Sequence, residues 1–227
     1  FAKLDVKIIQ ALGMTEDCVY AHFERPFDFR HGSVGKPFSG LQVKISEEGE
    51  LRVKSASNMI GYYKEPEMTA EMFDEEGYLK TGDICEYDHD GFLFVTGRLK
   101  DQFKTDKGKY ISPAPIEMKL LANPDIEQCC VVGINLPQPI ALIVLSLEGK
   151  KLEPNALIKN LEDLRKNTNP HFKKYEHISK MIILKEDWTI ENNCLTPTLK
   201  IKRPIIEKKY LDSFETWNNH SESIIFE

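Results

Sequence analysis

The chain has 227 residues, of which 41% are hydrophobic and 29% are charged, and its formal net charge at pH 7 is −6. This is the composition of an ordinary globular protein, so general disorder is excluded. The acidic balance is opposite to the basic face that broad nucleic-acid binding requires, and we expect no nucleic-acid partner.

No stretch of the sequence is expected to span a bilayer, because a spanning helix needs about 20 consecutive apolar residues. The best candidate, 129–147, is interrupted by one asparagine, one glutamine and two prolines. The five cysteines are odd in number and contain no CxxC pair, which is typical of reduced thiols in a cytosolic protein. We therefore expect a cytoplasmic location, with a peripheral membrane association left open.

The first residue is Phe1 and not methionine, and no basic segment is followed by an apolar one. No signal peptide is therefore visible, and we expect a longer protein that extends upstream. The length by itself agrees with one or two domains.

The first part of the chain predicts mostly short β-segments. Residues 6–9 predict a strand, and a turn follows at 13–16. Residues 24–40 are rich in proline, glycine and charge and predict a loop. Apolar and polar residues alternate over 41–54 on both sides of 47–50, which predicts a β-hairpin with a four-residue turn.

The next elements complete a β-rich region. A short helix is expected over 65–73, where Pro66 lies near the start, and a strand over 92–95. Residues 1–99 therefore predict a small barrel or sheet subdomain.

Helix and strand patterns alternate after residue 100, which predicts a compact α+β domain over 100–227. Pro154 marks the start of a helix whose leucines and isoleucine recur at helical spacing. The other expected elements are helices over 116–121 and 204–214 and strands over 129–134, 140–147 and 178–184.

Two segments of the first region carry groups that suit a nucleotide. Thr15 and Glu16 follow Gly13, and a hydroxyl beside a carboxylate suits a phosphate and its Mg²⁺. Residues 78–83, Tyr-Leu-Lys-Thr-Gly-Asp, are expected to end a loop, and the ionised carboxylate of Asp83 can accept hydrogen bonds from two vicinal hydroxyls of a ribose. Taken singly, each segment also agrees with a solvated turn.

Two basic segments lie later in the chain. Arg98 follows Gly97 at the predicted boundary, and its planar fork suits a phosphate or ribose, although a solvated linker has the same pattern. Residues 195–203 form a basic loop whose lysines suit the neutralisation of oxygen charge, although a surface loop has this composition too. The six histidines show no metal-ligand spacing with cysteine.

The ordered set of these segments resembles the adenylate-forming superfamily, which contains acyl-CoA synthetases, nonribosomal-peptide adenylation domains and firefly-type luciferases. Residues 107–113 and 195–203 are most similar to the long-chain acyl-CoA synthetase branch. The resemblance extends from residue 1 to about 210. It rests on Gly-Met-Thr-Glu at 13–16, Gly-Glu-Leu-Arg-Val at 49–53, Gly-Tyr-Tyr at 61–63, Tyr-Leu-Lys-Thr-Gly-Asp at 78–83, Gly-Arg-Leu-Lys-Asp at 97–101 and Thr-Pro-Thr-Leu-Lys-Ile-Lys-Arg at 196–203.

The resemblance implies a fold of the α+β class. Residues 1–99 correspond to the C-terminal part of the large AMP-binding domain, a remnant of its distorted β-barrel. Residues 100–227 correspond to the small mobile C-terminal domain. The phosphate loop and the acid pocket of the family lie in a large N-terminal domain that this sequence does not contain, so the 227-residue chain alone is expected to be inactive in adenylation.

The resemblance also implies a nucleotide site. Members of the family use ATP, Mg²⁺ and CoA to convert a carboxylate to acyl-AMP and then to a thioester. By similarity, Gly13 and Thr15 contact the nucleotide, with Thr15 at the α-phosphate, and Glu16 helps to hold Mg²⁺. Asp83 binds the ribose hydroxyls, and Arg98 contacts the ribose or a phosphate.

The catalytic lysine of the adenylation step corresponds to Lys200. Many members of the family have glycine before this lysine, whereas this chain has Leu199. Lys202 is a competitor for the role, and Arg203 then matches an arginine of the family. We favour Lys200 over Lys202.

The remaining implied roles concern domain movement and the second half-reaction. Lys100 matches the hinge about which the small domain swings. The loop around Lys104 and Gly108 is expected to bind CoA, because glycine allows the backbone to approach the pantetheine closely.

The sequence favours the C-terminal part of a long-chain fatty acid–CoA ligase, with a fatty acid or other carboxylate, ATP and CoA as partners, together with the N-terminal domain of the same chain. One alternative is another adenylate-forming ligase with a different acid or acceptor. A second alternative is a non-catalytic α+β interaction module. The presence of Thr15, Glu16, Asp83, Arg98 and Lys200 together argues against it, because a binding module does not need this whole set.

Overall fold

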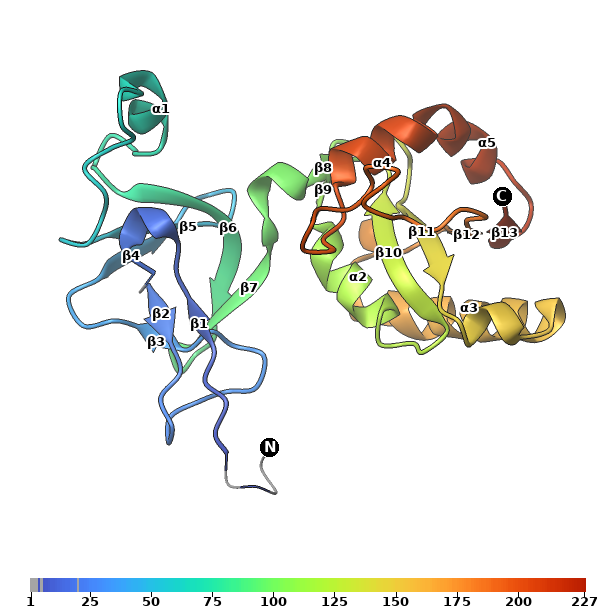
Figure 1. Cartoon of the computed structure of the whole chain (residues 1–227), viewed down its shortest axis with the longest axis horizontal. Helices are drawn as coiled ribbons and strands as arrows, with labels where there is room; N and C mark the ends of the chain where they lie inside the picture. Colours follow the sequence, from blue (N-terminus) through green and yellow to red (C-terminus); the bar gives the residue numbers. More distant parts are fainter. Residues whose placement is uncertain (1–3, 5, 20) are drawn as a thin grey trace. The chain divides into compact units, whose positions relative to one another are not determined.

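The computed structural model describes residues 4, 6–19 and 21–227, which form two compact units (Figure 1). Unit 1 is Phe1–Lys100 and unit 2 is Asp101–Glu227. Within the described residues, no helix combines the length and the apolar character needed to cross a membrane.

Unit 1 is built from two open antiparallel sheets and one short helix. The three-stranded sheet contains β1 (Ala11–Leu12), β2 (His22–Phe23) and β3 (Lys36–Pro37). The four-stranded sheet contains β4 (Gln42–Ile45), β5 (Glu50–Lys54), β6 (Leu79–Tyr87) and β7 (Leu93–Arg98), and the helix is α1 (Pro66–Glu71). The described part of this unit forms no closed barrel, and its derivation from a barrel stays a prediction.

The predicted β-hairpin is confirmed in β4 and β5, whose register pairs Val43 with Val53. Leu51 and Val53 are fully buried and pack with Leu79 and Leu93 in the core of unit 1. The alternation in the sequence thus places one face of the hairpin against this core.

Two expectations for unit 1 were wrong. The described residues 6–9 form no strand, although β1 follows shortly after them. Residues 79–83 were assigned to a loop, yet they begin the nine-residue strand β6. A glycine inside a strand is unusual, so Gly82 made this segment resemble a turn. In the structure Gly82 has a φ of +71°, and the pairing of β6 with both of its neighbours contains a register irregularity.

Unit 2 contains a four-stranded sheet, a two-stranded hairpin and four α-helices. In the sheet, β10 and β11 are antiparallel, whereas β11, β12 and β13 run parallel. Its strands are β10 (Ile126–Val132), β11 (Ile140–Leu145), β12 (Lys180–Ile183) and β13 (Ile224–Phe226), and the hairpin strands are β8 (Phe103–Lys104) and β9 (Tyr110–Ile111). The helices are α2 (Pro113–Leu120), α3 (Pro154–Thr168), α4 (Arg203–Tyr210) and α5 (Phe214–Asn218).

Short 3-10 helices connect these elements at several points. They are η2 (Thr15–Asp17), η3 (Leu99–Asp101), η4 (Gly149–Lys151), η5 (Asn169–His171), η6 (Lys174–Glu176) and η7 (Leu211–Ser213). The predicted final helix at 204–214 is therefore divided, with η7 between α4 and α5.

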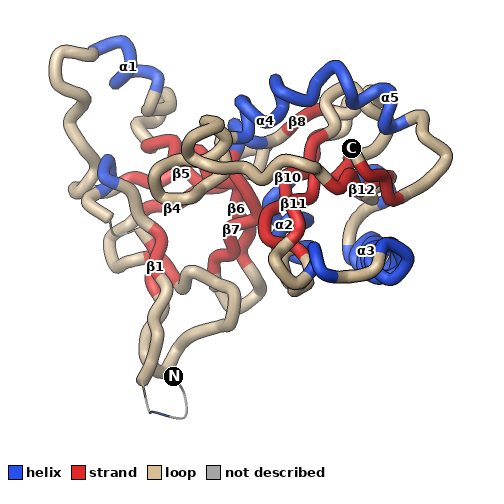
Figure 2. Tube along the Cα trace, turned by 45° about the vertical axis from the view of Figure 1, so that its right-hand side comes forward, coloured by secondary structure: helices blue, strands red, loops and turns tan. Residues whose placement is uncertain are grey.

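The sheet of unit 2 is covered on both faces. Apolar residues of α2 and α3 pack on one face, and those of α4 and α5 pack on the other. Figure 2 shows α3 and the pair α4 and α5 on opposite sides of the strands. Every residue of β11 is buried, as expected for a strand between two helical layers.

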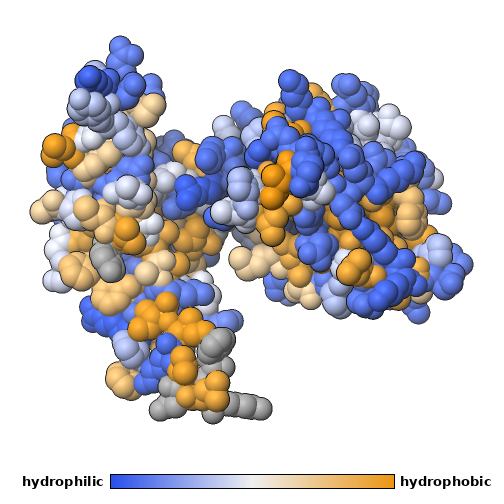
Figure 3. Space-filling view, in the orientation of Figure 1, coloured by the Kyte–Doolittle hydropathy of each residue, from blue (hydrophilic) through white to orange (hydrophobic). Residues whose placement is uncertain are grey.

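The cysteines and the apolar surface differ between the units. Cys18 is exposed, whereas Cys85 in unit 1 and the three cysteines of unit 2 are buried as free thiols. Figure 3 shows hydrophobic side chains at the surface near the N-terminal end of unit 1. Exposed large apolar residues in this part of the chain include Ile8, Phe27 and Phe29.

Candidate functional site

Gly13 begins a tight loop that presents Thr15. A side chain at position 13 would place its Cβ 1.5 Å from the carbonyl oxygen of Val19, so only glycine fits. The buried Asp17 carboxylate accepts hydrogen bonds from the backbone N–H groups of Met14 and Val19, both at 2.9 Å. This bonding fixes the loop on both sides of Thr15, which is exposed.

Glu16 is held at its side chain and at its backbone. The Tyr62 hydroxyl donates to Glu16 Oε1 at 2.7 Å, and the N–H of Met59 donates to the Glu16 carbonyl at 2.7 Å. The hydrogen bond to the carboxylate raises the pKa of the Tyr62 hydroxyl. The segment before α1 therefore orients Glu16.

The donor set at Glu16 fits a Mg²⁺ ion that arrives with a nucleotide. Such an ion takes one or two carboxylates and fills its other positions with phosphate oxygens and water. The hydrogen bond from Tyr62 uses one acceptor position of the Glu16 carboxylate, and the remaining positions could hold the ion. In the described part of the chain, no group of three or more His, Cys, Asp or Glu side chains is arranged to hold a metal.

Asp83 and Arg98 are brought together by the pairing of β6 with β7. They are direct cross-strand partners, and Arg98 Nε lies 2.7 Å from Asp83 Oδ1. Asp83 is buried, whereas the Arg98 side chain is 52% exposed. Asp83 is the acidic partner of Arg98 among the described residues, and the half-exposed guanidinium can also meet a phosphate or a ribose.

The surroundings of Asp83 make its charge costly. Burial raises the pKa of Asp83, the Arg98 guanidinium opposes this rise, and the nearby Glu50 carboxylate adds to it. Glu50 is itself buried and accepts the N–H of Gly82 at 3.1 Å. A carboxylate in this setting gains from any further donor, and two ribose hydroxyls supply such donors.

Lys200 lies on a hairpin formed by residues 194–202, which we call the lysine hairpin. Leu195 and Ile201 form a bridge, and the N–H of Thr196 donates to the carbonyl of Lys200 at 2.8 Å. Cys194 and Leu195 are buried in the core at its base. Lys200 is exposed, and its ammonium forms no ion pair with any residue that the structure describes.

The tip of the hairpin contains an unusual backbone conformation. Leu199 has a φ of +61°, and its N–H donates to the carbonyl of Thr196 at 2.9 Å. Glycine adopts this conformation without steric cost, which agrees with the glycine that the family resemblance leads us to expect at this position. Lys202 differs from Lys200, because its Nζ lies 2.5 Å from Asn193 Oδ1.

The β8–β9 hairpin places Lys104 and Gly108 together. The N–H of Gly108 donates to the carbonyl of Thr105 at 3.0 Å, and Gly108 has a φ of +74°. The Lys104 Nζ lies 5.5 Å from the centre of the Tyr110 ring. Gly108 is thus required by the turn itself, and Lys104 and Gly108 are both exposed.

The predicted site residues fall into two groups, one in each unit. Unit 1 carries Gly13, Thr15, Glu16, Asp83 and Arg98, and unit 2 carries Lys104, Gly108 and Lys200. Lys100 is exposed in η3, at the last position of unit 1.

The sequence pattern of the family described as AMP-binding enzyme C-terminal domain matches residues 100–222, more than half of the chain. The chain belongs to this adenylate-forming family. It is 34% identical over 230 residues to the long-chain-fatty-acid–CoA ligase FadD15 of Mycobacterium bovis, covering 93% of this chain and 38% of the relative. It is 31% identical to long-chain-fatty-acid–CoA ligase 5 of Rattus norvegicus, covering 88% of this chain and 34% of that protein.

Solved structures of the family have the same fold. The anthranilate CoA ligase AuaEII in complex with anthranoyl-AMP matches 90% of this chain and 40% of its own, with a TM-score of 0.72 and 27% identity. The adenylation domain of a carboxylate reductase from Mycobacterium chelonae matches 94% of this chain and 35% of its own, with a TM-score of 0.72 and 25% identity. The chain thus spans well under half of the length of these relatives.

The sequence did not predict two residue pairs in this member of the AMP-binding family, Glu16 with Tyr62 and Glu117 with Arg203. Tyr62 belonged to a recognised segment but had no assigned role, and its partner Glu16 lies 46 residues away. Arg203 was noted only as a match to an arginine of the family, whereas the structure buries it beside Glu117. An arginine at the first position of an otherwise amphipathic helix was the available signal for this second pair.

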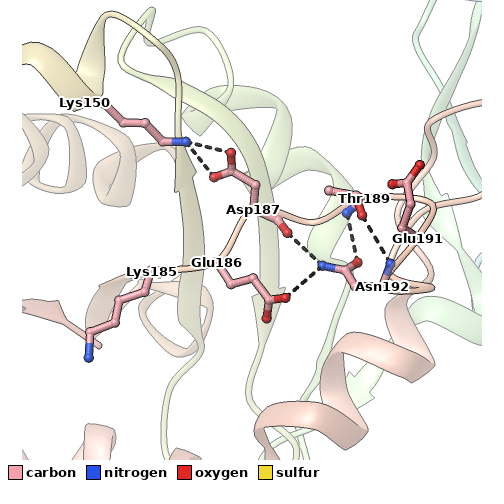
Figure 4. Close-up of a pocket in the computed structure, with 7 residues that line it drawn as sticks. All are labelled: Lys150, Lys185, Glu186, Asp187, Thr189, Glu191 and Asn192. Carbon is pink, nitrogen blue, oxygen red and sulfur yellow. Dashed lines mark hydrogen bonds and ion pairs between the residues drawn. The ribbon is translucent and has the colours of Figure 1, made fainter.

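A surface hollow of about 620 Å³ lies just before the lysine hairpin and contains no predicted site residue (Figure 4). The Asn192 side chain bonds to the N–H of Thr189 at 2.9 Å and to the carbonyl of Asp187 at 2.8 Å. Lys150 pairs with Asp187 at 2.7 Å. These bonds stabilise the segment that leads into the lysine hairpin. Two of the charged side chains that line the hollow, Lys150 and Asp187, neutralise each other.

Proposed function

We propose that this chain forms the C-terminal part of a long-chain fatty acid–CoA ligase. The reaction class is supported by one observation above all, the exposed and unpaired Lys200 at the end of a braced hairpin. The class of acid is supported by the long-chain ligases among the relatives. ATP, CoA and a fatty acid are the proposed substrates of the whole protein.

In the first half-reaction, a carboxylate oxygen of the acid attacks the α-phosphorus of ATP. The bond to the pyrophosphate oxygen breaks, which gives acyl-AMP and pyrophosphate. Thr15 contacts the α-phosphate, Asp83 accepts hydrogen bonds from the ribose hydroxyls, and Arg98 binds a phosphate or the ribose. The surroundings described above support these roles, since the side chain of Arg98 is half-exposed and burial disfavours the charged form of Asp83.

Lys200 addresses the main electrostatic obstacle of this step. A carboxylate and a polyphosphate repel each other, and an ammonium that contacts oxygens of both offsets this repulsion as they approach. Glu16, oriented by Tyr62, would help to hold a Mg²⁺ ion, which would supply positive charge to the phosphates.

In the second half-reaction, the CoA thiol loses its proton and its sulfur attacks the acyl carbonyl. The bond to the AMP oxygen breaks, which gives acyl-CoA and AMP. We assign CoA binding to the loop around Lys104 and Gly108, and the hinge between the two half-reactions to Lys100. The exposure of all three residues supports these roles.

Lys200→Ala in the full-length protein tests the proposal. We expect acid-dependent ATP–pyrophosphate exchange to fall by roughly 100-fold or more, on the scale of a lost oxyanion donor. Thioester formation from supplied acyl-adenylate should be largely retained, because this step does not need Lys200.

Lys202→Ala is the matched control, since Lys202 is engaged by Asn193 and should affect exchange little. Equal losses of both half-reactions in Lys200→Ala would contradict the assignment. A larger loss in Lys202→Ala than in Lys200→Ala would transfer the role to Lys202.

The class of acid is tested by AMP release with ATP, Mg²⁺ and CoA across carboxylates of graded chain length. Release that requires both CoA and a long-chain acid supports the proposal. Release with another acid or acceptor would favour another ligase of the same family. Absence of nucleotide binding and of AMP release would favour a non-catalytic interaction module.

A further inference from the structure

A buried ion pair links the start of α4 to β10 and α2. Arg203 Nη2 lies 2.6 Å from Glu117 Oε1, and both side chains are about nine-tenths buried. Arg203 Nη1 donates to the carbonyl of Val131 at 2.8 Å, and Glu117 Oε1 accepts the N–H of Val131 at 2.6 Å. The pair therefore binds both backbone polar groups of one residue of the strand, Val131.

The position of Val131 explains what the pair does. β10 is an end strand of its sheet, so alternate N–H and C=O groups on its outer edge have no strand partner. Glu117 and Arg203 satisfy both groups of Val131. The guanidinium fork thus docks the first residue of α4 at a defined point along β10.

The same residue lies three positions after Lys200. The lysine hairpin ends at Lys202, whose N–H donates to the carbonyl of Cys194 at 2.8 Å, and Arg203 follows directly. The two ends of the hairpin are therefore held differently. Cys194 and Leu195 combine apolar packing with N–H bonds to Asn192 Oδ1 at 3.2 Å and to the carbonyl of Thr189 at 3.0 Å, which are all bonds within their own segment. Arg203, in contrast, makes charge-assisted hydrogen bonds of fixed direction to β10 and α2.

We infer that the Glu117–Arg203 pair is a positioning device for the adenylation lysine, because it fixes the register of the lysine hairpin on β10 and thereby the place of the Lys200 ammonium. This inference rests on the proposed function. Packed apolar side chains at these two positions would stabilise the fold at least as well, since replacing a buried ion pair in this way is often neutral or stabilising. Apolar side chains, however, do not form directional bonds that fix the position of the hairpin.

The test is the double variant Glu117→Gln with Arg203→Met in the full-length protein. The glutamine amide can still accept the N–H of Val131 and donate to its carbonyl, so the strand edge stays satisfied while the link to α4 is removed. We expect kcat of adenylation to fall roughly 100-fold with an unchanged KM for ATP, as for a reacting group displaced by about 1 Å. Thioester formation from supplied acyl-adenylate should stay close to that of the parent.

Two measurements separate positioning from folding. Both tryptophans of the chain, Trp188 and Trp217, are buried in unit 2, so their fluorescence reports whether that unit is folded. Amide exchange at Lys202 should become faster, because its hydrogen bond closes the base of the hairpin. If the double variant does not fold, Arg203→Lys replaces it. Lysine retains the charge without the fork, and an intermediate loss of adenylation kcat is expected.

The controls distinguish this inference from the proposed function. Lys209 is on α4, as Arg203 is, and its ammonium pairs with the exposed Glu186. Lys209→Met removes this pair and should change neither half-reaction. Lys200→Ala, assayed alongside, reports on the proposed function by itself. If Lys200→Ala abolishes adenylation while the folded double variant adenylates at the parent rate, the inference is overturned. It is likewise overturned if the double variant loses both half-reactions equally, because that result indicates a general structural role.

Discussion

Leu199 is the residue at which local strain and proposed chemistry meet. Its φ of +61° lies in the left-handed region, which costs an L-residue about 1–2 kcal/mol. Its side chain is 67% exposed, so little packing is gained in return. The hairpin holds this conformation through bonds on both sides of Leu199, at Thr196 and Lys200.

Leu199→Gly should stabilise unit 2. Glycine relieves the strain but loses about 0.5–1 kcal/mol through the entropy of the unfolded chain, which leaves a net gain of up to about 1.5 kcal/mol. Urea unfolding followed by tryptophan fluorescence measures this gain. Leu211→Gly is the control, because Leu211 is also exposed but has a φ of −52°, and it should be destabilising. A lower unfolding midpoint for Leu199→Gly would contradict the strain.

At the scale of elements, His22 connects the two sheets of unit 1. It lies on β2 of the three-stranded sheet, is fully buried, and its Nε2 is 2.7 Å from the Tyr87 hydroxyl at the end of β6. Burial lowers the pKa of His22 to about 4 from 6.5. The folded chain therefore keeps this ring neutral at a pH where the unfolded chain protonates it.

The consequence is a loss of stability of unit 1 in acid. At a pH well above 6.5, His22 is neutral in both states and contributes no pH dependence to stability. As the pH falls from about 6.5 to about 4, the unfolded state binds a proton that the folded state does not, which costs up to about 1.4 kcal/mol per pH unit.

His22→Gln should remove much of this sensitivity. The readout is amide exchange in β2 and β6, measured for parent and variant at the same pH values. We expect the parent to lose more protection than the variant between pH 7 and pH 5. Parallel losses in the two proteins would show that His22 does not control the effect, since lowered carboxylate pKa values such as that of Asp74 act on both.

The elements that the sequence predicted are those governed by local patterns. Alternation marked β4 and β5, and helical spacing after Pro154 marked α3. The strand expected at 6–9 failed although the segment is apolar, because strand formation depends on a partner edge that local pattern does not encode. β6 was missed for the opposite reason, since Gly82 disguises a well-paired strand.

The candidate site divides in the same way. Motif residues such as Thr15, Asp83 and Lys200 were found through an ordered set of short segments. Their supporting partners were not found, because Glu16 and Tyr62 are 46 residues apart and Glu117 and Arg203 are 86 residues apart. Two polar residues this far apart in the sequence form no periodic pattern or motif that would indicate a contact. Their pairing is visible only in the folded structure.

At the scale of the whole molecule, each unit encloses a core of its own. Unit 2 has apolar clusters on both faces of its sheet, whereas unit 1 has one smaller cluster. A buried core on both faces of a sheet is sufficient for a domain of this size to fold alone.

We therefore expect residues 101–227, expressed separately, to fold. Their tryptophan fluorescence should show one cooperative urea transition at the midpoint that the same signal gives in the 227-residue chain. The single-unit fragment and the longer chain are compared under identical conditions. A broad transition or a clearly lower midpoint would show that the two clusters of unit 2 are insufficient.

The distribution of thiols has a practical consequence for work on this protein. Cys18 is exposed, Cys85 is buried in unit 1, and Cys129, Cys130 and Cys194 are buried in unit 2. A thiol-reactive label should therefore modify the native chain once, beside the Thr15 loop. Opening of unit 1 exposes one more thiol, and opening of unit 2 exposes three. The mass of the labelled chain thus records which unit has opened, without any engineered probe.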